Sequence, residues 1–284
     1  MKTIYISWDE ALGYKKDELE YAAGVLREGG LVAFPTETVY GLGGNGLMKE
    51  ASVKIYEAKG RPSDNPLILH ISSRQELEPI VRGITPEAEA LMEAFWPGPM
   101  TLIFQKAPEV PLETTGGLET VAVRMPSHAG ARELIRQAGV PVAAPSANTS
   151  GRPSPTRAEH VKEDLDGKID VIIDGGQVGI GIESTIIDLT EDVPVILRPG
   201  YITKAMAEQV VGDVRMDPGL SGKDPSKHPK APGMKYRHYA PKASMVVYQG
   251  DREKVIKKIC REAAGYPEDK VGILATEETK DAYT

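Results

Sequence analysis

The chain has 284 residues, a length that predicts two domains, or one large domain with part of a second, because domains usually hold ~100–200 residues. Lys and Arg number 34 against 41 Asp and Glu, and this acidic balance argues against a general nucleic-acid coat or a protein that binds anionic membranes, although it allows a local basic cleft. The single cysteine excludes an intramolecular disulfide framework, and the lack of any apolar export or membrane-spanning segment predicts a cytoplasmic protein.

Short β-branched apolar runs, each ended by Pro, Gly, Asn or Ser, recur along the first 200 residues and predict buried strands that lead into loops. Several of these runs follow one another without a full helix between them, so we expect a mixed sheet with flanking helices, an α/β fold. In chain order the expected strands are Leu31–Phe34, Leu67–Ile71, Thr101–Phe104, Val121–Val123, Val140–Ala144, Val171–Ile173, Thr185–Leu189 and Val195–Leu197.

Amphipathic segments between these runs predict helices, and small polar residues or glycines at their ends predict where they start and stop. The expected helices are Lys49–Lys59 with Gly60 as its stop, a helix capped by Ser127 that runs to about Ala138 before Gly139, and Arg157–Leu165 and Lys204–Val211 with Thr156 and Thr203 as their caps.

The composition changes between Gly212 and Ala243, where a Pro-, Gly- and Lys-rich stretch lacks apolar periodicity and is typical of a linker. We therefore assign residues 1–205 to an α/β domain, 206–243 to a linker and 244–284 to a partial α/β domain. In the last segment MVVY, a helix from about Asp251 to Ala264 and VGILA predict one strand–helix–strand unit. This unit buries too little apolar surface to be stable alone.

Two familiar nucleotide-binding signatures do not explain the sequence. Gly41-x-Gly43-x-x-Gly46 matches the dinucleotide fingerprint by letter, but Pro35–Tyr40 separates it from its strand and no acidic residue follows a second strand at the required place. A phosphate-binding G-x-x-x-x-G-K-[ST] loop and a G-x-S-x-G nucleophile elbow are absent. If the chain binds ATP, it uses an uncommon site.

Polar loops after the predicted strands carry the strongest functional signal. We interpret Phe34–Gly46 (FPTETVYGLGGNG) as such a loop, in which glycines and hydroxyls allow close backbone approach to a ligand; the alternative is an ordinary turn. Pro141–Thr156 (PVAAPSANTSGRPSPT) offers hydroxyls, amides and backbone N–H groups to an anion.

Five cationic side chains stand in loops that flank the predicted strands of this acidic protein. Each alone has a simpler explanation, such as a surface ion pair or a charge that offsets a helix dipole. Together they predict a cleft for a di- or triphosphate. These residues are Lys59, Arg61, Arg124, Arg152 and Arg198.

Taken in order, these segments resemble the YrdC-like threonylcarbamoyl-AMP synthase family, in its long form with a linker and a C-terminal domain. The resemblance runs from about Lys16 to Pro241. It rests on FPTETVYGLG, AKGRP-x-x-NPLI-x-H, WPGP-T, T-VAVR-P, P-AAPSAN-SG-PSPT, G-ESTI-D, LRPG and APGMKYRHYAP. The long form has a Rossmann-like C-terminal domain of about a hundred residues, so we expect 244–284 to represent it only in part.

The resemblance implies a nucleotidyltransferase that makes threonylcarbamoyl-AMP and pyrophosphate from L-threonine, bicarbonate or CO2, and ATP. Mg²⁺ is expected to accompany ATP, without a dedicated protein metal site. Downstream transferase proteins would pass the threonylcarbamoyl group to an adenosine in tRNA, and direct tRNA binding is left open. The implied site residues fall into three sets: Lys59, Arg61, Ser146 and Asn148 for catalysis; Arg61, Asn65, Thr120, Ser146, Ser154, Arg198 and Tyr236 for ATP; and Thr36, His70, Arg124, Ala144 and Ser184 for L-threonine.

Two other functions are weighed against this one. A carbamoyl-adenylate module of the hydrogenase-maturation type would share the fold, but such proteins carry Cys-rich regions and this chain has one cysteine. A non-enzymatic RNA-binding protein would use the basic cleft on a phosphodiester backbone, but the acidic composition and the low aromatic content oppose it.

Overall fold

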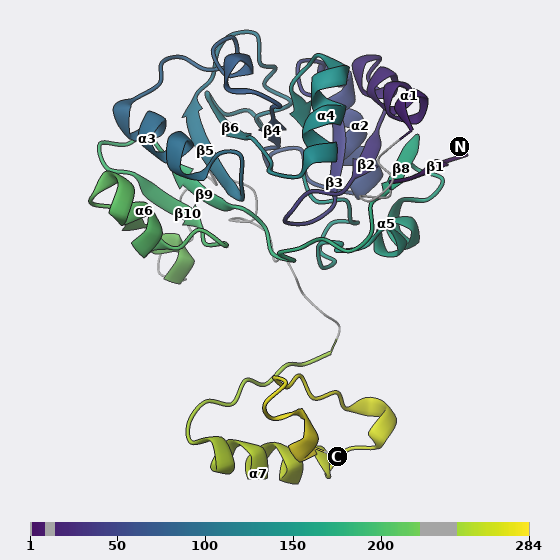
Figure 1. Ribbon diagram of the computed structural model, residues 1–284, viewed down its shortest axis with the longest axis vertical. Coiled ribbons are helices and arrows are strands. Elements are labelled where there is room, and N and C mark those ends of the chain that lie inside the picture. The colour runs from purple at the N-terminus through teal and green to yellow at the C-terminus, as the bar shows by residue number, and fades with distance from the viewer. Residues whose placement is uncertain (1, 9–14, 222–242, 284) are drawn as a thin grey trace. The chain divides into compact units, whose positions relative to one another are not determined.

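The computed structural model describes residues 2–8, 15–221 and 243–283. The chain divides into two compact units, Met1–Ala240 and Pro241–Thr284, which are described separately below (Figure 1).

The first unit is built on one large mixed sheet, as predicted. Its described strands are β1 (Ile4–Ser7), β2 (Val32–Phe34), β3 (Gly41–Asn45), β4 (Ile68–His70), β5 (Met100–Gln105), β6 (Thr120–Arg124), β7 (Val142–Ala143), β8 (Val171–Asp174), β9 (Thr185–Asp188), β10 (Val195–Arg198) and β11 (Arg215–Met216). They lie in the order β1-β8-β2-β3-β7-β4-β6-β5-β9-β10-β11. Parallel pairs such as β4 with β6 alternate with antiparallel pairs such as β5 with β6, so the mixed sheet is confirmed.

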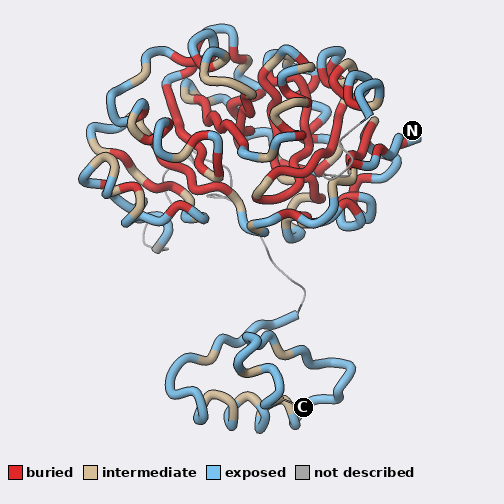
Figure 2. Tube along the Cα trace, viewed as in Figure 1, coloured by how far each residue is buried: buried red, intermediate tan, exposed pale blue. Residues whose placement is uncertain are grey.

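Helices cover the two faces of this sheet unequally. The described helices of the unit are α1 (Lys16–Arg27), α2 (Lys49–Lys59), α3 (Pro86–Phe95), α4 (Ala129–Ala138), α5 (Ala158–Leu165) and α6 (Lys204–Val211). Apolar side chains of α1 and α4 pack on β1, β2 and β8, while those of α2, α3, α5 and α6 join the core on the opposite face. Strand β2 shows the alternation, because Val32 and Phe34 face the first core and Ala33 faces the second. The strands of the unit form its buried centre, with exposed segments around them (Figure 2).

Among the described residues, one small core cluster on the sheet surface contains only side chains from strands, and a polar cleft lies beside it. The cluster consists of Ile68, Ile103, Ala122, Ile186 and Leu197. Since side chains at i and i+2 share one face of a strand, the polar neighbours two residues away point to the same surface. These neighbours are His70, Thr101, Arg124 and Ser184.

The helix ends follow the predictions in part. Gly60 and Gly139 end their helices in the left-handed conformation, with φ of 59° and 68°, and Thr203 Oγ1 accepts from Met206 N at 3.3 Å. The two other caps were wrong. Helix α4 is capped by His128, whose Nδ1 accepts from Ala131 N at 3.1 Å, instead of Ser127.

Helix α5 starts after Arg157, so Thr156 does not cap it. The backbone carbonyl of Thr156 instead accepts from Val178 N at 3.0 Å, which ties Thr156 to the loop that contains Val178.

The interpretation of Phe34–Gly46 as a ligand-binding loop was wrong for its second half. Residues Gly41–Asn45 form the buried strand β3, which pairs with β2 in an antiparallel hairpin. A Cβ atom on Gly43 would lie 2.8 Å from Phe34 Cε1, and one on Gly46 would lie 2.3 Å from Leu69 Cδ2. Packing within the sheet, and not a bound ligand, therefore requires these glycines.

The second unit contains helix α7 (Arg252–Ala263) and the short 3₁₀ turns Glu268–Lys270 and Lys280–Tyr283. The two strands predicted there, MVVY and VGILA, were wrong, since residues 243–283 contain no strand. Val247 and Leu274 in these runs are 73% and 88% exposed, so neither run has the paired backbone and covered face that stabilise a strand.

Candidate functional site

A polar cleft opens on the sheet surface beside the small cluster of strand side chains. It is lined by eight of the residues predicted for the site, together with Thr38, Val39, Gly41, Ile68, Pro145 and Glu183. The eight are Thr36, Arg61, His70, Ala144, Arg124, Ser146, Ser184 and Arg198. The structure thus brings together the whole set predicted for L-threonine and three of the residues predicted for ATP.

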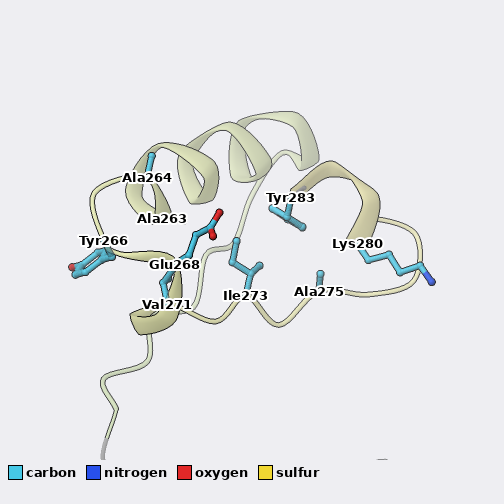
Figure 3. A pocket seen from close by; sticks show the side chains of 9 residues that line it. All are labelled: Ala263, Ala264, Tyr266, Glu268, Val271, Ile273, Ala275, Lys280 and Tyr283. Atoms are coloured by element: carbon cyan, nitrogen blue, oxygen red, sulfur yellow. The ribbon is translucent and has the colours of Figure 1, made fainter.

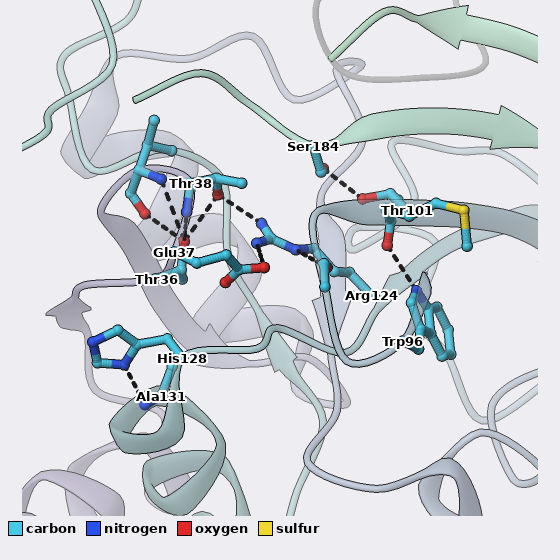
Figure 4. Close-up of polar contacts among 12 residues, drawn as sticks. Thr36, Glu37, Thr38, Trp96, Thr101, Arg124, His128, Ala131 and Ser184 are labelled. Carbon is cyan, nitrogen blue, oxygen red and sulfur yellow. Dashed lines mark hydrogen bonds and ion pairs between the residues drawn. The ribbon is translucent and has the colours of Figure 1, made fainter. Parts of the chain in front are cut away.

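Arg124 and His70 are neighbours because β4 and β6 run in parallel with these two residues in register at the carboxyl ends of the strands. Arg124 is 4% exposed, and its guanidinium is held from several sides. Nε donates to Gly98 O at 3.2 Å and Nη1 donates to Thr38 Oγ1 at 2.9 Å (Figure 4). Its donors are therefore fixed in direction before any ligand binds.

Glu37 supplies the counter-charge of Arg124, with Glu37 Oε1 2.6 Å from Arg124 Nη2 (Figure 4). Burial alone raises the pKa of the Glu37 carboxyl, but the charge of Arg124 and hydrogen bonds from Arg124 and the backbone of Ser127 outweigh it and lower the pKa. Sequence reasoning noted Glu37 only as part of a polar loop, because nothing in a single sequence shows which cation a carboxylate meets.

His70 is fully buried next to this pair. Burial, and then the positive charge of Arg124, lower the pKa of His70 to about 3. The imidazole is therefore neutral near pH 7, with Nδ1 3.1 Å from the carbonyl of Ile68. A neutral polar ring beside a buried guanidinium suits a small polar ligand that carries its own charges.

Arg198 and Ser184 lie next to each other in the lining of the cleft. Arg198 donates from Nε to Ser184 O and from Nη2 to Ser184 Oγ, both at 3.1 Å. Ser184 Oγ lies 2.7 Å from Thr101 Oγ1 (Figure 4). The turn after Arg198 fits against this segment only because residue 200 is glycine: a Cβ on Gly200 would lie 2.5 Å from Glu183 O. The two strand ends are thereby held together.

Arg61 enters the cleft from the loop after α2. Its Nε donates to Asn65 O at 3.2 Å and its Nη2 donates to Pro66 O at 3.0 Å. The loop thus folds back on the guanidinium and fixes it at the cleft wall. Asn65, predicted to contact ATP, is buried and contributes its backbone carbonyl to this arrangement.

Lys59 does not line the cleft, although we predicted that its charge would face the phosphates. It is 1% exposed, and its Nζ donates to the carbonyls of Ser146 and Asn148. Burial, and then the charge of Arg61, lower the pKa of Lys59 well below its usual range. The side chain therefore fixes the Ser146–Asn148 loop from behind, and Ser146 Oγ in turn donates to Asn148 Oδ1 at 2.5 Å.

The remaining predicted residues lie elsewhere. Arg152 was expected in the cleft, but it forms ion pairs with Asp164 and Glu163, because α5 presents both carboxylates beside it. Thr120 begins β6, at the opposite end of the strand from Arg124, and Tyr236 lies outside the described residues. Ser154 does not line the cleft but donates its hydroxyl hydrogen bond to Glu183, which does.

Sequence reasoning missed Glu183 as well as Glu37. Its signal was present in the GIESTI segment, where a carboxylate directly precedes Ser184 at the start of a strand. Among the described residues no group of three or more His, Cys, Asp or Glu side chains is placed to hold a metal ion. No helix in the described ranges is both long and apolar enough to cross a membrane.

The second unit has a hollow of its own, an open groove of about 690 Å³ beside α7 (Figure 3). It contains no residue predicted for the site. Its lining is Ala263, Ala264, Tyr266, Glu268, Val271, Ile273, Ala275, Lys280 and Tyr283.

Comparisons with known proteins agree with the order of the motifs. A family model described as "Telomere recombination" matches residues 24–200, and one described as "Threonylcarbamoyl-AMP synthase, C-terminal domain" matches residues 202–284. The threonylcarbamoyl-AMP synthase of Pyrococcus abyssi is 55% identical over 91% of this chain and 76% of its own length. That of Bacillus subtilis is 49% identical over 100% of this chain and 81% of its own.

A solved structure described as P. abyssi Sua5 complexed with L-threonine superposes with a TM-score of 0.89 at 50% identity, covering 98% of this chain and 82% of the other. The resemblance therefore extends from the sequence motifs to the arrangement of the sheet and helices.

Proposed function

Since the chain belongs to the threonylcarbamoyl-AMP synthase family, we propose that the cleft of its first unit is where L-threonine, bicarbonate or CO2, and ATP react to give threonylcarbamoyl-AMP and pyrophosphate. The main support for this assignment is that one cleft has two walls of different composition. One wall holds a buried, ion-paired arginine beside a neutral histidine, and the other holds arginines at loop and strand ends.

The first wall suits L-threonine. The fork of Arg124 matches the two oxygens of a carboxylate, and Thr36, His70, Ser184 and the backbone of Ala144 surround it with polar groups of small size. Thr36 Oγ1 is itself fixed by Thr38 Oγ1 at 2.9 Å and by Val39 O at 2.7 Å. A small amino acid is therefore bound by groups that need not rearrange.

The second wall suits the phosphates of ATP. Arg61 and Arg198 line it as cations, and Ser146, whose loop is held from behind by Lys59, adds a hydroxyl. Catalysis is then assigned to Arg61 and Ser146, with Lys59 and Asn148 acting through the loop that they hold. Asn65, Thr120, Ser154 and Tyr236 remain proposed nucleotide contacts.

The reaction places few covalent demands on the protein. The amine of threonine adds to CO2 and loses a proton, which gives a carbamate. A carbamate oxygen then forms a bond to the α-phosphorus of ATP, while the bond from that phosphorus to the bridging oxygen breaks and pyrophosphate leaves with the electron pair. The cleft contributes by aligning both reactants and by neutralising phosphate charge.

We propose several finer assignments beside this one. We place residues 206–243, with Tyr236, as a linker that acts as a lid, and 244–284 as part of a C-terminal α/β domain. We place the reaction in the cytoplasm and its product in the path to threonylcarbamoyl-modified adenosine in tRNA, through separate transferase proteins. Mg²⁺ is proposed to accompany ATP, where it would offset phosphate charge.

The test is pyrophosphate release by the full chain with ATP, L-threonine and bicarbonate, each omitted in turn. We expect release only when all three are present, and loss of release with Arg124→Gln. Arg82→Gln is the matched control, because Arg82 is exposed and outside the cleft lining. Equal release without threonine would refute the proposal, and release driven by carbamoyl phosphate instead would assign the chain to the alternative carbamoyl-adenylate chemistry.

A further inference from the structure

Glu183 is a carboxylate in a cleft that is otherwise built for anions. Of the described residues that line this cleft, three are arginines and Glu183 alone is acidic. It stands between the two proposed substrate walls, since Ser184 follows it on the threonine side and Ser154, a proposed nucleotide contact, donates to its carboxylate. Neither the fold nor the mechanism described so far explains why an anion stands here.

The backbone that carries Glu183 is fixed on several sides. Thr185 N donates to Pro99 O at 3.0 Å, Ser184 O accepts from Arg198 Nε at 3.1 Å, and the chain at Gly200 lies so close that a Cβ there would be 2.5 Å from Glu183 O. Ser154 then fixes the carboxylate itself. The charge is therefore held at a set place in the cleft instead of being free to turn into solvent.

A fixed carboxylate repels a polyphosphate unless a cation lies between them. Besides the arginines of the cleft lining, the substrates bring two cations, a divalent metal bound to ATP and the ammonium group of threonine. Mg²⁺ is bound in proteins by one or two carboxylates together with substrate phosphates, which is the donor set that Glu183 and ATP would supply. The contact to Ser154, on the proposed nucleotide side, favours the metal.

We propose that Glu183, oriented by Ser154, is the protein ligand for the Mg²⁺ ion that enters the cleft with ATP. This inference rests on the proposed function, because it takes the cleft to be the nucleotide site. It assigns to the chain a metal contact that consists of one carboxylate.

The test compares the affinity of the full chain for ATP in Mg²⁺ and in EDTA, by calorimetry, for wild type and Glu183→Gln. We expect the variant to bind Mg·ATP about tenfold more weakly, the lower end of the range for disturbed metal sites. In EDTA it should bind ATP at least as tightly as wild type, because the repulsive charge is gone. Glu109→Gln, which removes an exposed carboxylate outside the cleft lining, should change neither affinity.

Electron paramagnetic resonance of Mn²⁺ with ATP gives a readout independent of turnover, and the spectrum of the bound ion should differ between wild type and Glu183→Gln. Ser154→Ala keeps the charge of Glu183 and should lower the affinity for Mg·ATP by a smaller factor than Glu183→Gln does. This second variant tests the proposal if Glu183→Gln fails to fold.

Three other outcomes would contradict either this inference or the proposed function. Unchanged metal dependence together with a threefold or greater loss of threonine affinity in Glu183→Gln would overturn the inference and place Glu183 at the threonine ammonium. Unchanged affinities for both ligands would also overturn it. Failure of wild type to bind ATP in either condition would instead overturn the proposed function.

Discussion

Replacing Glu37 by glutamine tests the charge balance of the threonine wall. The Glu37 and Arg124 side chains are 14% and 5% exposed and lie 2.6 Å apart, so the substitution leaves Arg124 as a buried cation without its counter-charge. Removing one partner of a buried ion pair usually costs ~3–5 kcal/mol. Because Arg124 keeps its bonds to Gly98 and Thr38, we expect the lower end, about 3 kcal/mol of unfolding free energy.

Urea unfolding followed by tryptophan fluorescence measures this change. Both tryptophans, Trp8 and Trp96, belong to the first unit, so the signal reports on the part of the chain that contains the pair. L-threonine should then stabilise Glu37→Gln more than it stabilises wild type, because its carboxylate supplies the missing negative charge and its binding to the folded state adds stability.

A double-mutant cycle separates the pair from other effects of the substitution. Arg124→Met combined with Glu37→Gln removes both charges, and the double variant should be more stable than Glu37→Gln alone. If Glu37→Gln unfolds at the wild-type urea concentration, or if threonine stabilises both proteins equally, the pair does not set the electrostatics of this wall and the reasoning fails.

Three further predictions follow from the same contacts. The pKa of His70 is about 3 in the folded chain and 6.5 in the unfolded chain, so the unfolded chain binds an extra proton between these pH values. The free energy of unfolding of wild type, relative to that of His70→Asn, should therefore fall by ~1.4 kcal/mol per pH unit as the pH drops from 6.5 towards 3. A constant difference in unfolding free energy between pH 6.5 and 5, measured by urea titration, would contradict this. Lys59→Met should weaken ATP binding about tenfold and leave threonine binding nearly unchanged in calorimetry, because it leaves two buried carbonyls of the Ser146–Asn148 loop without their donor; equal losses for both ligands would point to general unfolding. Gly200→Ala should lower both the melting temperature and ATP affinity, since its Cβ would meet Glu183 O at 2.5 Å, whereas Gly179→Ala, which meets nothing within 4 Å, should change neither.

The sheet and one wall of the cleft were predictable because they depend on local patterns. Short apolar runs gave the strands, and polar residues at their ends pointed to the site. His70 and Arg124 were predicted to share one site, and the structure places them next to each other. Each residue ends a strand, and the two strands pair in parallel with these residues in register. Period-two alternation then determines that both share the open face with Ile68 and Ala122.

The errors arose where a residue's partner is distant in sequence. Gly43 in β3 and Gly46 just after it looked like parts of a ligand loop, but side chains there would collide with Phe34 on β2 and Leu69 on β4. Arg152 looked like a phosphate contact, yet Asp164 twelve residues later in the chain takes its charge. Charge type can be read from a sequence, whereas the counter-charge that cancels it depends on the folded arrangement.

The same reasoning explains why counting cations overstated the basic character of the cleft. Of the five predicted cations, Lys59 is buried behind the cleft and Arg152 is paired outside it, so Arg61, Arg124 and Arg198 remain on its walls. Two carboxylates then divide these walls by charge. Glu37 neutralises Arg124, so that wall suits a zwitterionic amino acid better than a polyphosphate. In the proposed function the phosphates of ATP bind at Arg61 and Arg198, and the inferred role of Glu183 places a cation between its carboxylate and the nucleotide. In this proposal, acidic residues keep the two substrates apart in one small cleft as much as basic ones do.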